Sequence, residues 1–197
     1  NGDLTVSNDL LTGSPVAFRI DTTLQKQIRL TKTGEGPARG SLVWYYFTAD
    51  PQQINGYPGL KIKKQVTRYN SITKTQETVD KKTVLKQGEK LSISLVIETD
   101  HELRYVLIND RRSSALEPIE TSSEYVYGNL PHYRSVRDDG VRLLADYIPA
   151  GRHTVSYEVR VAFEGEFCNG MASLQCMYRP DISAYSGSVV LKAEGSH

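Results

Sequence analysis

The alternation of apolar and polar residues is the feature that most restricts the fold of this chain. Residues 154–163 (TVSYEVRVAF) alternate throughout, and residues 91–98 (LSISLVIE) alternate over most of their length. A period of two places the apolar side chains on one face, as in an antiparallel strand that is buried on one side. Shorter segments with strand-forming composition lie at residues 16–20, 27–31, 42–48, 61–69, 104–109, 141–146 and 188–192. We therefore predict an all-β protein.

Turn signals between these segments indicate how the strands are connected. Asp139-Gly140 separates two candidate strands and predicts a hairpin with a two-residue type I′ turn, in which both central residues have positive φ. Pro149-Ala150-Gly151 predicts a second turn. Helix evidence is poor, because the best helical window, residues 113–119, is short and ends at Pro118. Short strands separated by such turns favour an antiparallel β-sandwich.

A polar stretch divides the chain into two regions. Residues 49–59 follow the apolar run at 42–47 and contain two prolines and two glycines. We predict a β-strand segment over residues 1–52 and a β-sandwich domain over residues 53–197. The first segment is too short to form a sandwich alone, so it either joins the sheet of the main domain or belongs to a neighbouring domain.

The charge balance excludes some classes of partner. With 24 basic and 23 acidic residues the formal net charge is +1, which gives no electrostatic argument for binding nucleic acid. No apolar run is long enough to form a membrane-spanning helix, so we expect no direct membrane insertion.

Residues 61–90 hold nine basic and three acidic side chains. Solubility and protection of strand edges account for such lysines, and a basic face for a partner is the alternative.

The sequence contains no recognisable catalytic, cofactor or metal site. The four histidines lack metal-ligand spacing, and neither a nucleophile elbow nor a phosphate-binding loop is present. Two carboxylate pairs, Glu164 with Glu166 and Asp138 with Asp139, are compatible with acid–base chemistry or calcium binding. Turn formation and solvation of a strand face explain both pairs more simply. We assign no catalytic residue, no cofactor and no metal.

The two cysteines, Cys168 and Cys176, have a spacing that fits neither a redox motif nor a zinc site. Asn169-Gly170 between them helps the chain to reverse, which would bring the two thiols together. If the protein is exported, we favour a disulfide between Cys168 and Cys176. Reduced, buried cysteines in a cytosolic protein are the alternative.

An ordered series of motifs covers the C-terminal two thirds of the chain. They are R-D-D at 137–139, P-A-G at 149–151 with Y-E-V-R at 157–160, G-E-F at 165–167, and M-Y-R-P at 177–180 followed by A-Y-S at 184–186. This order resembles the C-terminal macroglobulin-like (MG10-type) domain of bacterial alpha-2-macroglobulins. The residues that carry the resemblance are Arg137, Asp138, Asp139, Pro149, Gly151, Tyr157, Gly165, Met177, Tyr178 and Pro180.

The chemistry of these motif residues predicts structural roles for them. Gly151 and Gly165 are expected at turns. Tyr157 and Tyr178 are expected at the edge of a sandwich core, with hydroxyls available to the backbone. Met177 is expected to fill a gap near aromatic rings. Arg137 is expected to pair with Asp138 or Asp139 and to fix the hairpin.

The resemblance also implies a function. The chain would be a macroglobulin-like sandwich, preceded over residues 1–52 by part of a CUB-like region, within a much larger exported protein. That parent would be periplasmic or anchored to the outer membrane, and would trap proteases after cleavage of a bait region. The thioester motif C-x-E-Q is absent from these residues. The expected partners are therefore neighbouring domains of the parent and, through the parent, target proteases.

We carry three hypotheses forward. The first is a non-catalytic domain of a protease-trapping protein, which serves interdomain packing and stabilisation. The second is an extracellular adhesion or carbohydrate-binding module, for which Tyr125 with Tyr127 and Tyr45 with Tyr46 are candidate platforms. The third is a hydrolase, for which the sequence offers no recognisable site.

Overall fold

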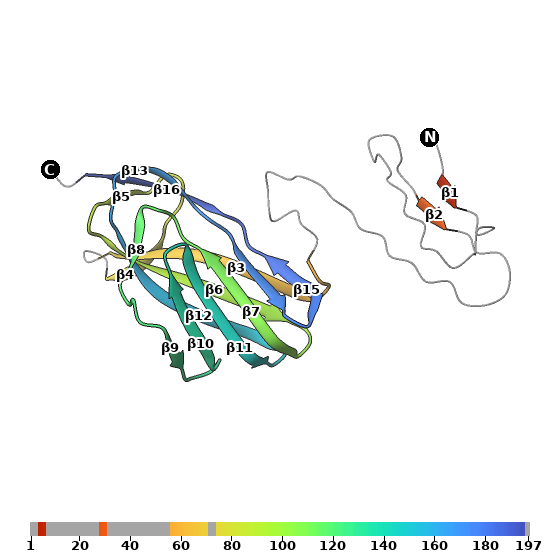
Figure 1. Cartoon of the computed structure of the whole chain (residues 1–197). Coiled ribbons are helices and arrows are strands. Elements are labelled where there is room, and N and C mark those ends of the chain that lie inside the picture. The colour runs from red at the N-terminus through yellow and green to blue at the C-terminus, as the bar shows by residue number, and fades with distance from the viewer. Residues whose placement is uncertain (1–3, 7–27, 31–55, 71–73, 196–197) are drawn as a thin grey trace, which may run out of the picture. The chain divides into compact units, whose positions relative to one another are not determined.

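The computed structural model describes residues 4–6, 28–30, 56–70 and 74–195 (Figure 1). The chain divides into two units, residues 1–46 and 47–197. In the first unit β1 (Leu4–Val6) pairs in parallel with β2 (Ile28–Leu30), which lies within the predicted segment 27–31. The predicted strands at 16–20 and 42–48, Tyr45 and Tyr46, and the boundary between 52 and 53 lie outside the described residues.

Three sheets make up the described part of the second unit. The six-stranded sheet has the order β15-β14-β7-β11-β10-β9, the five-stranded sheet β4-β3-β6-β12-β8, and the three-stranded sheet β13-β16-β5. The strands are β3 (Leu60–Asn70), β4 (Thr75–Thr78), β5 (Val84–Lys86), β6 (Lys90–Thr99), β7 (Leu103–Arg111), β8 (Leu116–Pro118), β9 (Glu124–Val126), β10 (His132–Arg137), β11 (Gly140–Ile148), β12 (Gly151–Val161), β13 (Gly165–Asn169), β14 (Ala172–Cys176), β15 (Arg179–Tyr185) and β16 (Val189–Glu194).

The pairing confirms the predicted all-β, antiparallel sandwich class. Within the second unit, the pairs resolved among the described strands are antiparallel, except that β16 runs parallel to β5. The window at 113–119, the best helical candidate, contains strand β8 instead, which pairs with β12. No helix that could cross a bilayer occurs in the part of the chain that the structure describes.

The two strongest sequence patterns form the centre of the five-stranded sheet. β12 pairs with β6 over a continuous register from Gly151 opposite Thr99 to Arg160 opposite Lys90. Along β12 the alternation turns Val155, Tyr157, Val159 and Val161 inward and the intervening residues outward. The period-two pattern therefore predicted both the strand and the face that it buries.

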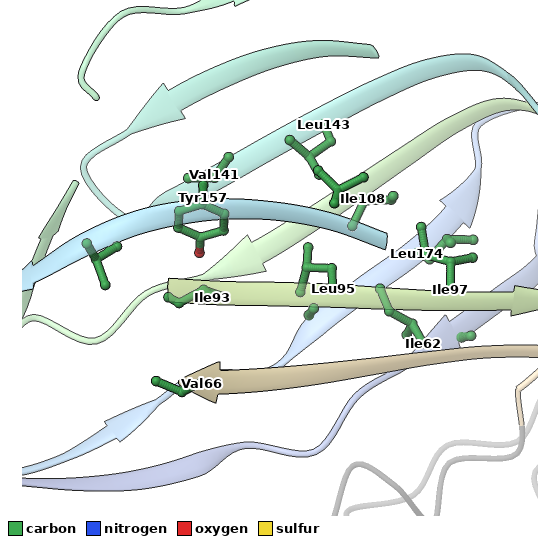
Figure 2. Packing of buried hydrophobic residues seen from close by; sticks show 14 of the residues in the cluster. Ile62, Val66, Ile93, Leu95, Ile97, Ile108, Val141, Leu143, Tyr157 and Leu174 are labelled. Atoms are coloured by element: carbon green, nitrogen blue, oxygen red, sulfur yellow. The ribbon is translucent and has the colours of Figure 1, made fainter. Parts of the chain in front are cut away.

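The core lies between the five-stranded and six-stranded sheets. Ile62 and Val66 of β3 and Ile93, Leu95 and Ile97 of β6 belong to the same buried cluster as residues of the facing sheet, namely Ile108, Val141, Leu143 and Leu174 (Figure 2). Burying one such aliphatic side chain contributes about 1.5–3 kcal/mol relative to leaving it exposed. This apolar layer holds the two sheets face to face.

The predicted hairpin is present, but its turn is displaced by one residue. Arg137 pairs with Gly140, so the loop residues are Asp138 and Asp139, neither of which has positive φ; the type I′ prediction centred on Asp139-Gly140 is therefore wrong. Gly140, with φ of 157°, is the first residue of β11. A Cβ atom there would lie 2.1 Å from the carbonyl oxygen of Asp110. Close contact with β7, and not turn formation, therefore requires glycine at this position.

Candidate functional site

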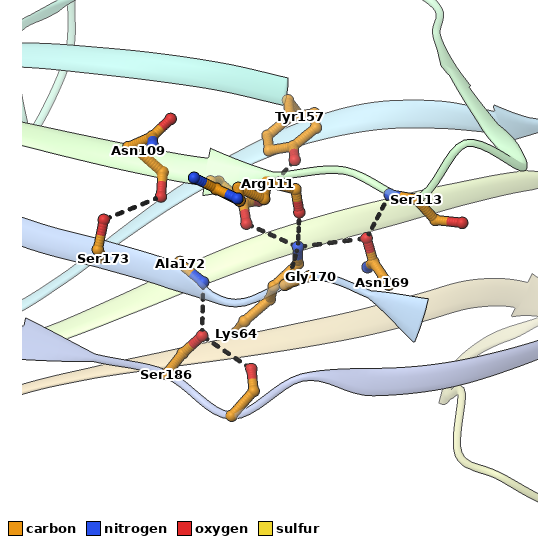
Figure 3. Close-up of polar contacts among 12 residues, drawn as sticks. Lys64, Asn109, Arg111, Ser113, Tyr157, Asn169, Gly170, Ala172, Ser173 and Ser186 are labelled. Atoms are coloured by element: carbon orange, nitrogen blue, oxygen red, sulfur yellow. Dashed lines mark hydrogen bonds and ion pairs between the residues drawn. The ribbon is translucent and has the colours of Figure 1, made fainter. Parts of the chain in front are cut away.

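Four polar side chains from four strands meet inside the protein. They are Lys64 of β3, Asp110 of β7, Tyr157 of β12 and Asn169 of β13, and we call them the buried polar cluster. Figure 3 labels Lys64, Tyr157 and Asn169. The side chains of Lys64 and Asp110 are 0% exposed. The four strands belong to three sheets, so the cluster joins the five-stranded sheet to both of the others.

The strand pattern of β3 carries Lys64 into the core. Leu60, Ile62, Lys64 and Val66 alternate with more exposed neighbours, so Lys64 occupies an inward position in an otherwise aliphatic series. A buried ammonium must have partners, because removing it from water is very costly. It donates to Oδ1 of Asp110 at 2.6 Å, to the carbonyl oxygens of Arg111 at 2.8 Å and Gly170 at 2.9 Å, and to Oδ1 of Asn169 at 3.3 Å.

Asp110 is held from two sides. Its Oδ1 faces Lys64, and its Oδ2 accepts a hydrogen bond of 2.6 Å from the hydroxyl of Tyr157. Burial raises the pKa of Asp110, and the Lys64 charge opposes that shift. Burial likewise lowers the pKa of Lys64, against the attraction of Asp110. Burial raises the pKa of Tyr157 well above its usual value, so this hydroxyl keeps its proton and remains a donor.

Asn169 completes the cluster at the end of β13. Its Oδ1 accepts from Lys64 and, at 3.2 Å, from the backbone N–H of Ser113. Its Nδ2 is buried and has no hydrogen-bond partner among the residues that the structure describes. Two donors therefore fix the amide oxygen, whereas the amide nitrogen donates no hydrogen bond to any described residue.

The arrangement offers no route for a diffusing substrate. The ion pair at its centre is inaccessible to solvent, so a reactant would have to come from the chain itself. Within the described residues, no group of three or more His, Cys, Asp or Glu side chains lies close enough together to hold a metal ion.

Sequence reasoning found one member of this cluster and missed the others. Tyr157 was predicted at the core edge with a hydroxyl for the backbone; it is fully inside, and its hydroxyl binds a carboxylate instead. Lys64 was counted with the basic residues of 61–90, all of which lie in the described part of the chain, and it alone among those nine is buried. Its place in the alternating series of β3 was the available signal.

Met177 and Tyr178 lie on the surface, whereas Tyr178 was predicted at the core edge and Met177 in a gap near aromatic rings. Met177 is 47% exposed and Tyr178 is 75% exposed. The ring of Tyr178 packs edge-to-face on Tyr105, with centroids 5.2 Å apart. Both residues follow Cys176 at the turn between β14 and β15, where the chain leaves the sheet. Pro180 lies at the start of β15, and its carbonyl accepts from Gln175.

The hairpin residues do not make the predicted ion pair. Arg137 donates to the hydroxyl of Ser135 at 3.1 Å, whereas Asp139 lies 3.5 Å from the guanidinium of Arg142. Arg142 lies three residues after Asp139 and is opposite Ser135 in the hairpin, whereas Arg137 is opposite Gly140. By contrast, Gly151 and Gly165 have φ of 128° and 130° at the starts of β12 and β13, as expected of turn positions. Pro149 lies in the short link between β11 and β12.

Cys168 and Cys176 are not bridged, which corrects the predicted disulfide. Both thiols are free, and Cys168 is exposed whereas Cys176 is buried. The chain does not reverse at Asn169-Gly170 as predicted, because β13 and β14 run in the same direction and pair antiparallel with β16 and β15 in one continuous register. It changes sheet instead, since Cys168 lies on β13 and Cys176 lies on β14. The two cysteines therefore belong to different sheets and cannot act as a simple hairpin pair.

A second group of tyrosines lies exposed on strand β9 and just after it. Tyr127 is 82% exposed, and its ring lies 4.9 Å from that of Tyr125 at an angle of 55°. Tyr125 also pairs across the strands with Tyr133. These rings form a small aromatic surface at the edge of the six-stranded sheet.

Comparison with known proteins places these features in a family. The family model of the bacterial alpha-2-macroglobulin MG10 domain matches residues 59–181. The fold is similar to that of Salmonella alpha-2-macroglobulin reacted with methylamine, with 17% identity, a TM-score of 0.52, and coverage of 68% of this chain and 9% of that one. It is also similar to an Escherichia coli alpha-2-macroglobulin fragment from domain MG7 to the C-terminus, with 15% identity, a TM-score of 0.53, and coverage of 74% and 24%.

A eukaryotic sequence is also similar. Circularly permutated Ras protein 2 of Dictyostelium discoideum is 22% identical over 168 residues, which cover 84% of this chain and 4% of that protein. The chain thus spans a small part of each of these relatives. Because the family model covers more than half of the 197 residues, the chain belongs to the family of bacterial alpha-2-macroglobulin MG10 domains.

Proposed function

We propose that this chain is a non-catalytic C-terminal sandwich domain of a larger, exported alpha-2-macroglobulin-like protein that traps proteases. Within that protein it packs against neighbouring domains and stabilises the assembly. The family match over residues 59–181 supports this proposal. So does the small share, 9% to 24%, that the chain spans of similar alpha-2-macroglobulin structures. A further similar structure is that of trypsin-activated alpha-2-macroglobulin from Escherichia coli.

The observation that carries the packing role is an exposed apolar surface made by Tyr105, Met177 and Tyr178, which we call the Tyr178 patch. All three side chains are close to half exposed or more. Large apolar groups gathered on a surface are typical of sites that contact another domain or protein. The first two residues of the family motif M-Y-R-P, Met177 and Tyr178, lie on this patch and not in the core, which suits a contact with a neighbouring domain of the parent.

The proposed role is non-catalytic because no solute can reach the buried polar cluster. We further propose that the parent protein is exported to the periplasm or anchored to the outer membrane. The family supports this location, and no residue of the sandwich bears on it.

The test compares the solvent access of Tyr178 in the isolated chain and in the parent protein. Hydroxyl-radical labelling with mass spectrometry would measure the oxidation of Tyr178, with Tyr127, which lies just after β9, as a matched control. We expect Tyr178 to be protected in the parent and Tyr127 to be less affected. Equal labelling of Tyr178 in both proteins would contradict the packing role, as would a parent reading frame without further macroglobulin-like domains.

A second function is favoured by one observation, the exposed ring pair of Tyr125 and Tyr127. We propose it as the alternative, an extracellular adhesion or carbohydrate-binding module, because exposed aromatic rings offer apolar faces to sugar rings. Binding to a glycan array that is lost in Tyr125→Ala and Tyr127→Ala variants but kept in Tyr69→Ala, another exposed tyrosine, would favour it over the packing role.

A further inference from the structure

The buried polar cluster contains the three groups that amide formation between side chains requires. Lys64 supplies a primary amine, Asn169 supplies a carboxamide, and Asp110 supplies a carboxyl group. The amine nitrogen lies 2.6 Å from Oδ1 of Asp110 and 3.3 Å from Oδ1 of Asn169 (Figure 3). This packing is independent of the parent protein, because all three residues belong to the described sandwich.

We propose that Lys64 and Asn169 form an intramolecular isopeptide bond between Nζ and Cγ, assisted by Asp110. In this reaction the Nζ–Cγ bond forms, the Cγ–Nδ2 bond of Asn169 breaks, and one molecule of ammonia leaves. Nothing is oxidised or reduced, so the step needs no co-reactant.

The protons balance within the cluster. A proton passes from the Lys64 ammonium to the Asp110 carboxylate, which leaves a neutral amine and a carboxylic acid. The amine lone pair attacks Cγ of Asn169, and the electron pair of its C=O bond moves onto Oδ1. Asp110 then gives its proton to Nδ2, which departs as ammonia, and takes up a proton from Nζ as the amide forms. The products are the amide, ammonia and protonated Asp110.

The surroundings favour the reactive protonation state. Burial lowers the pKa of Lys64 and raises that of Asp110, so both shifts favour the neutral amine and acid. The carbonyls of Arg111 and Gly170 accept from Nζ at 2.8 and 2.9 Å, which can use both hydrogens of a neutral amine. The lone pair of Nζ then points toward Asp110 and Asn169.

The amide is also placed for attack. The backbone N–H of Ser113 donates to Oδ1 of Asn169 at 3.2 Å, where negative charge develops in the tetrahedral intermediate. Nδ2, the leaving nitrogen, has no hydrogen-bond partner within the described residues that would hold it. The hydroxyl of Tyr157 fixes Asp110 through Oδ2 and leaves Oδ1 to shuttle the proton.

The bond would connect positions that are 105 residues apart and would tie β3 to β13. A cross-link that closes so long a loop restricts the unfolded chain strongly. It would therefore give the domain resistance to heat and to mechanical or proteolytic opening without any disulfide.

The test is the intact mass of the denatured 197-residue protein, followed by peptide mapping. We expect the mass to lie below the sequence mass by one ammonia, and a digest to yield one branched peptide that joins Lys64 to Asn169. An unchanged mass would overturn the proposal. Loss of one water with Lys64 joined to Asp110 would overturn the assignment to Asn169.

Matched variants separate this bond from a competing reaction. Asn169 precedes Gly170, and cyclisation of an Asn-Gly pair to a succinimide also releases ammonia. In Lys64→Met the isopeptide cannot form, so we expect the sequence mass there, whereas Lys63→Met, which changes an exposed lysine of the same strand, should keep the mass loss. An ammonia loss that persists in Lys64→Met, or the absence of the branched peptide from the wild type, would overturn the proposal even where a variant folds poorly.

Discussion

The hydroxyl of Tyr157, on the five-stranded sheet, donates a hydrogen bond of 2.6 Å to Oδ2 of Asp110, on the six-stranded sheet. Two facing sheets are thus joined by a polar contact at the centre of an apolar layer. The contact is short because the acceptor carries charge and is shielded from water. Both Tyr157 and Lys64 therefore donate to Asp110. A substitution at any of these three residues should alter the hydrogen bonds of the other two.

Removal of the buried cation should destabilise the domain strongly. In Lys64→Met the carboxyl group of Asp110 has no cationic partner inside the protein and the bond to Asn169 cannot form, and we expect a loss of at least about 3–5 kcal/mol in the free energy of unfolding. Chemical denaturation of both proteins measures the loss. The double variant Lys64→Met with Asp110→Asn removes the charge while keeping an acceptor for Tyr157, so it should recover part of the loss. A single and a double variant of equal stability would contradict this account.

The pH dependence of Lys64→Met follows from the same carboxyl group. The pKa of Asp110 is already raised by burial, and loss of the cation raises it further. A carboxyl group whose pKa is raised on folding makes its full contribution to stability when the pH is below its pKa in the unfolded state, which is about 3.9. That contribution is lost as the pH rises through the pKa in the folded state. The stability difference between wild type and Lys64→Met should therefore be smallest in acid and grow toward neutral pH. A difference that is constant with pH would contradict the assignment.

Tyr157 should resist ionisation while the protein is folded. Its pKa is raised well above 10.0 by burial and by Asp110. Such a group holds its proton more tightly in the folded state, so its contribution to stability is present below about 10 and is lost as pH rises through the folded pKa. Tyrosinate absorbance should show a tyrosine that titrates only on unfolding, and Tyr157→Phe should lose that late component. Persistence of the late component in Tyr157→Phe would assign it to another residue.

The fold followed from the sequence where burial is one-sided and local. Residues 154–163 predicted β12 and its inward face, because every second residue of a half-buried strand faces the core and is apolar. Strands β13 to β15 were not predicted, because the chain there changes sheet near Gly170 and meets Pro180 at the start of β15. β14 also pairs with β7, which is far away in the sequence, and local patterns do not report such a partner.

The candidate site was less accessible to sequence reasoning for a different reason. A lysine in a lysine-rich segment is usually solvated, and Lys64 is distinguished only by its position between Ile62 and Val66. Asp110 and Asn169 lie at the ends of β7 and β13, where nothing local separates a buried carboxylate or amide from a turn residue. Only the pairing of the sheets brings them together. In the same way, the exposure of Met177 and Tyr178 reflects the turn geometry and not their hydrophobicity.

Gly140 should tolerate no side chain. Gly140→Ala would place Cβ 2.1 Å from the carbonyl oxygen of Asp110, and its φ of 157° is unfavourable for alanine, so we expect a loss of about 1–3 kcal/mol or more. Gly128→Ala is the matched control, because its φ of 141° is also positive but the space around it is open. Thermal denaturation should show the larger loss for Gly140→Ala. Equal losses would mean that backbone conformation, and not contact with β7, requires the glycine.

The isolated chain should inhibit no protease. If trapping needs a bait region and the rest of the parent, the sandwich alone has no means of capturing an enzyme. We expect trypsin to cleave a small and a large substrate at unchanged rates in the presence of excess 197-residue protein. Stoichiometric loss of activity toward the large substrate would contradict the proposed packing role and would give this domain a direct part in trapping.

The two cysteines should react at very different rates. Cys168 is exposed, whereas Cys176 is buried and burial raises the pKa of its thiol. A thiol reagent should therefore modify one cysteine per native molecule quickly and the second only after denaturation, with Cys168→Ser removing the fast phase and Cys176→Ser the slow one. The measurement also decides the redox question that the sequence left open. If the native protein releases neither thiol until a reductant is added, Cys168 and Cys176 are bridged after all, and the chain must fold back between β13 and β14, which run in the same direction in this fold.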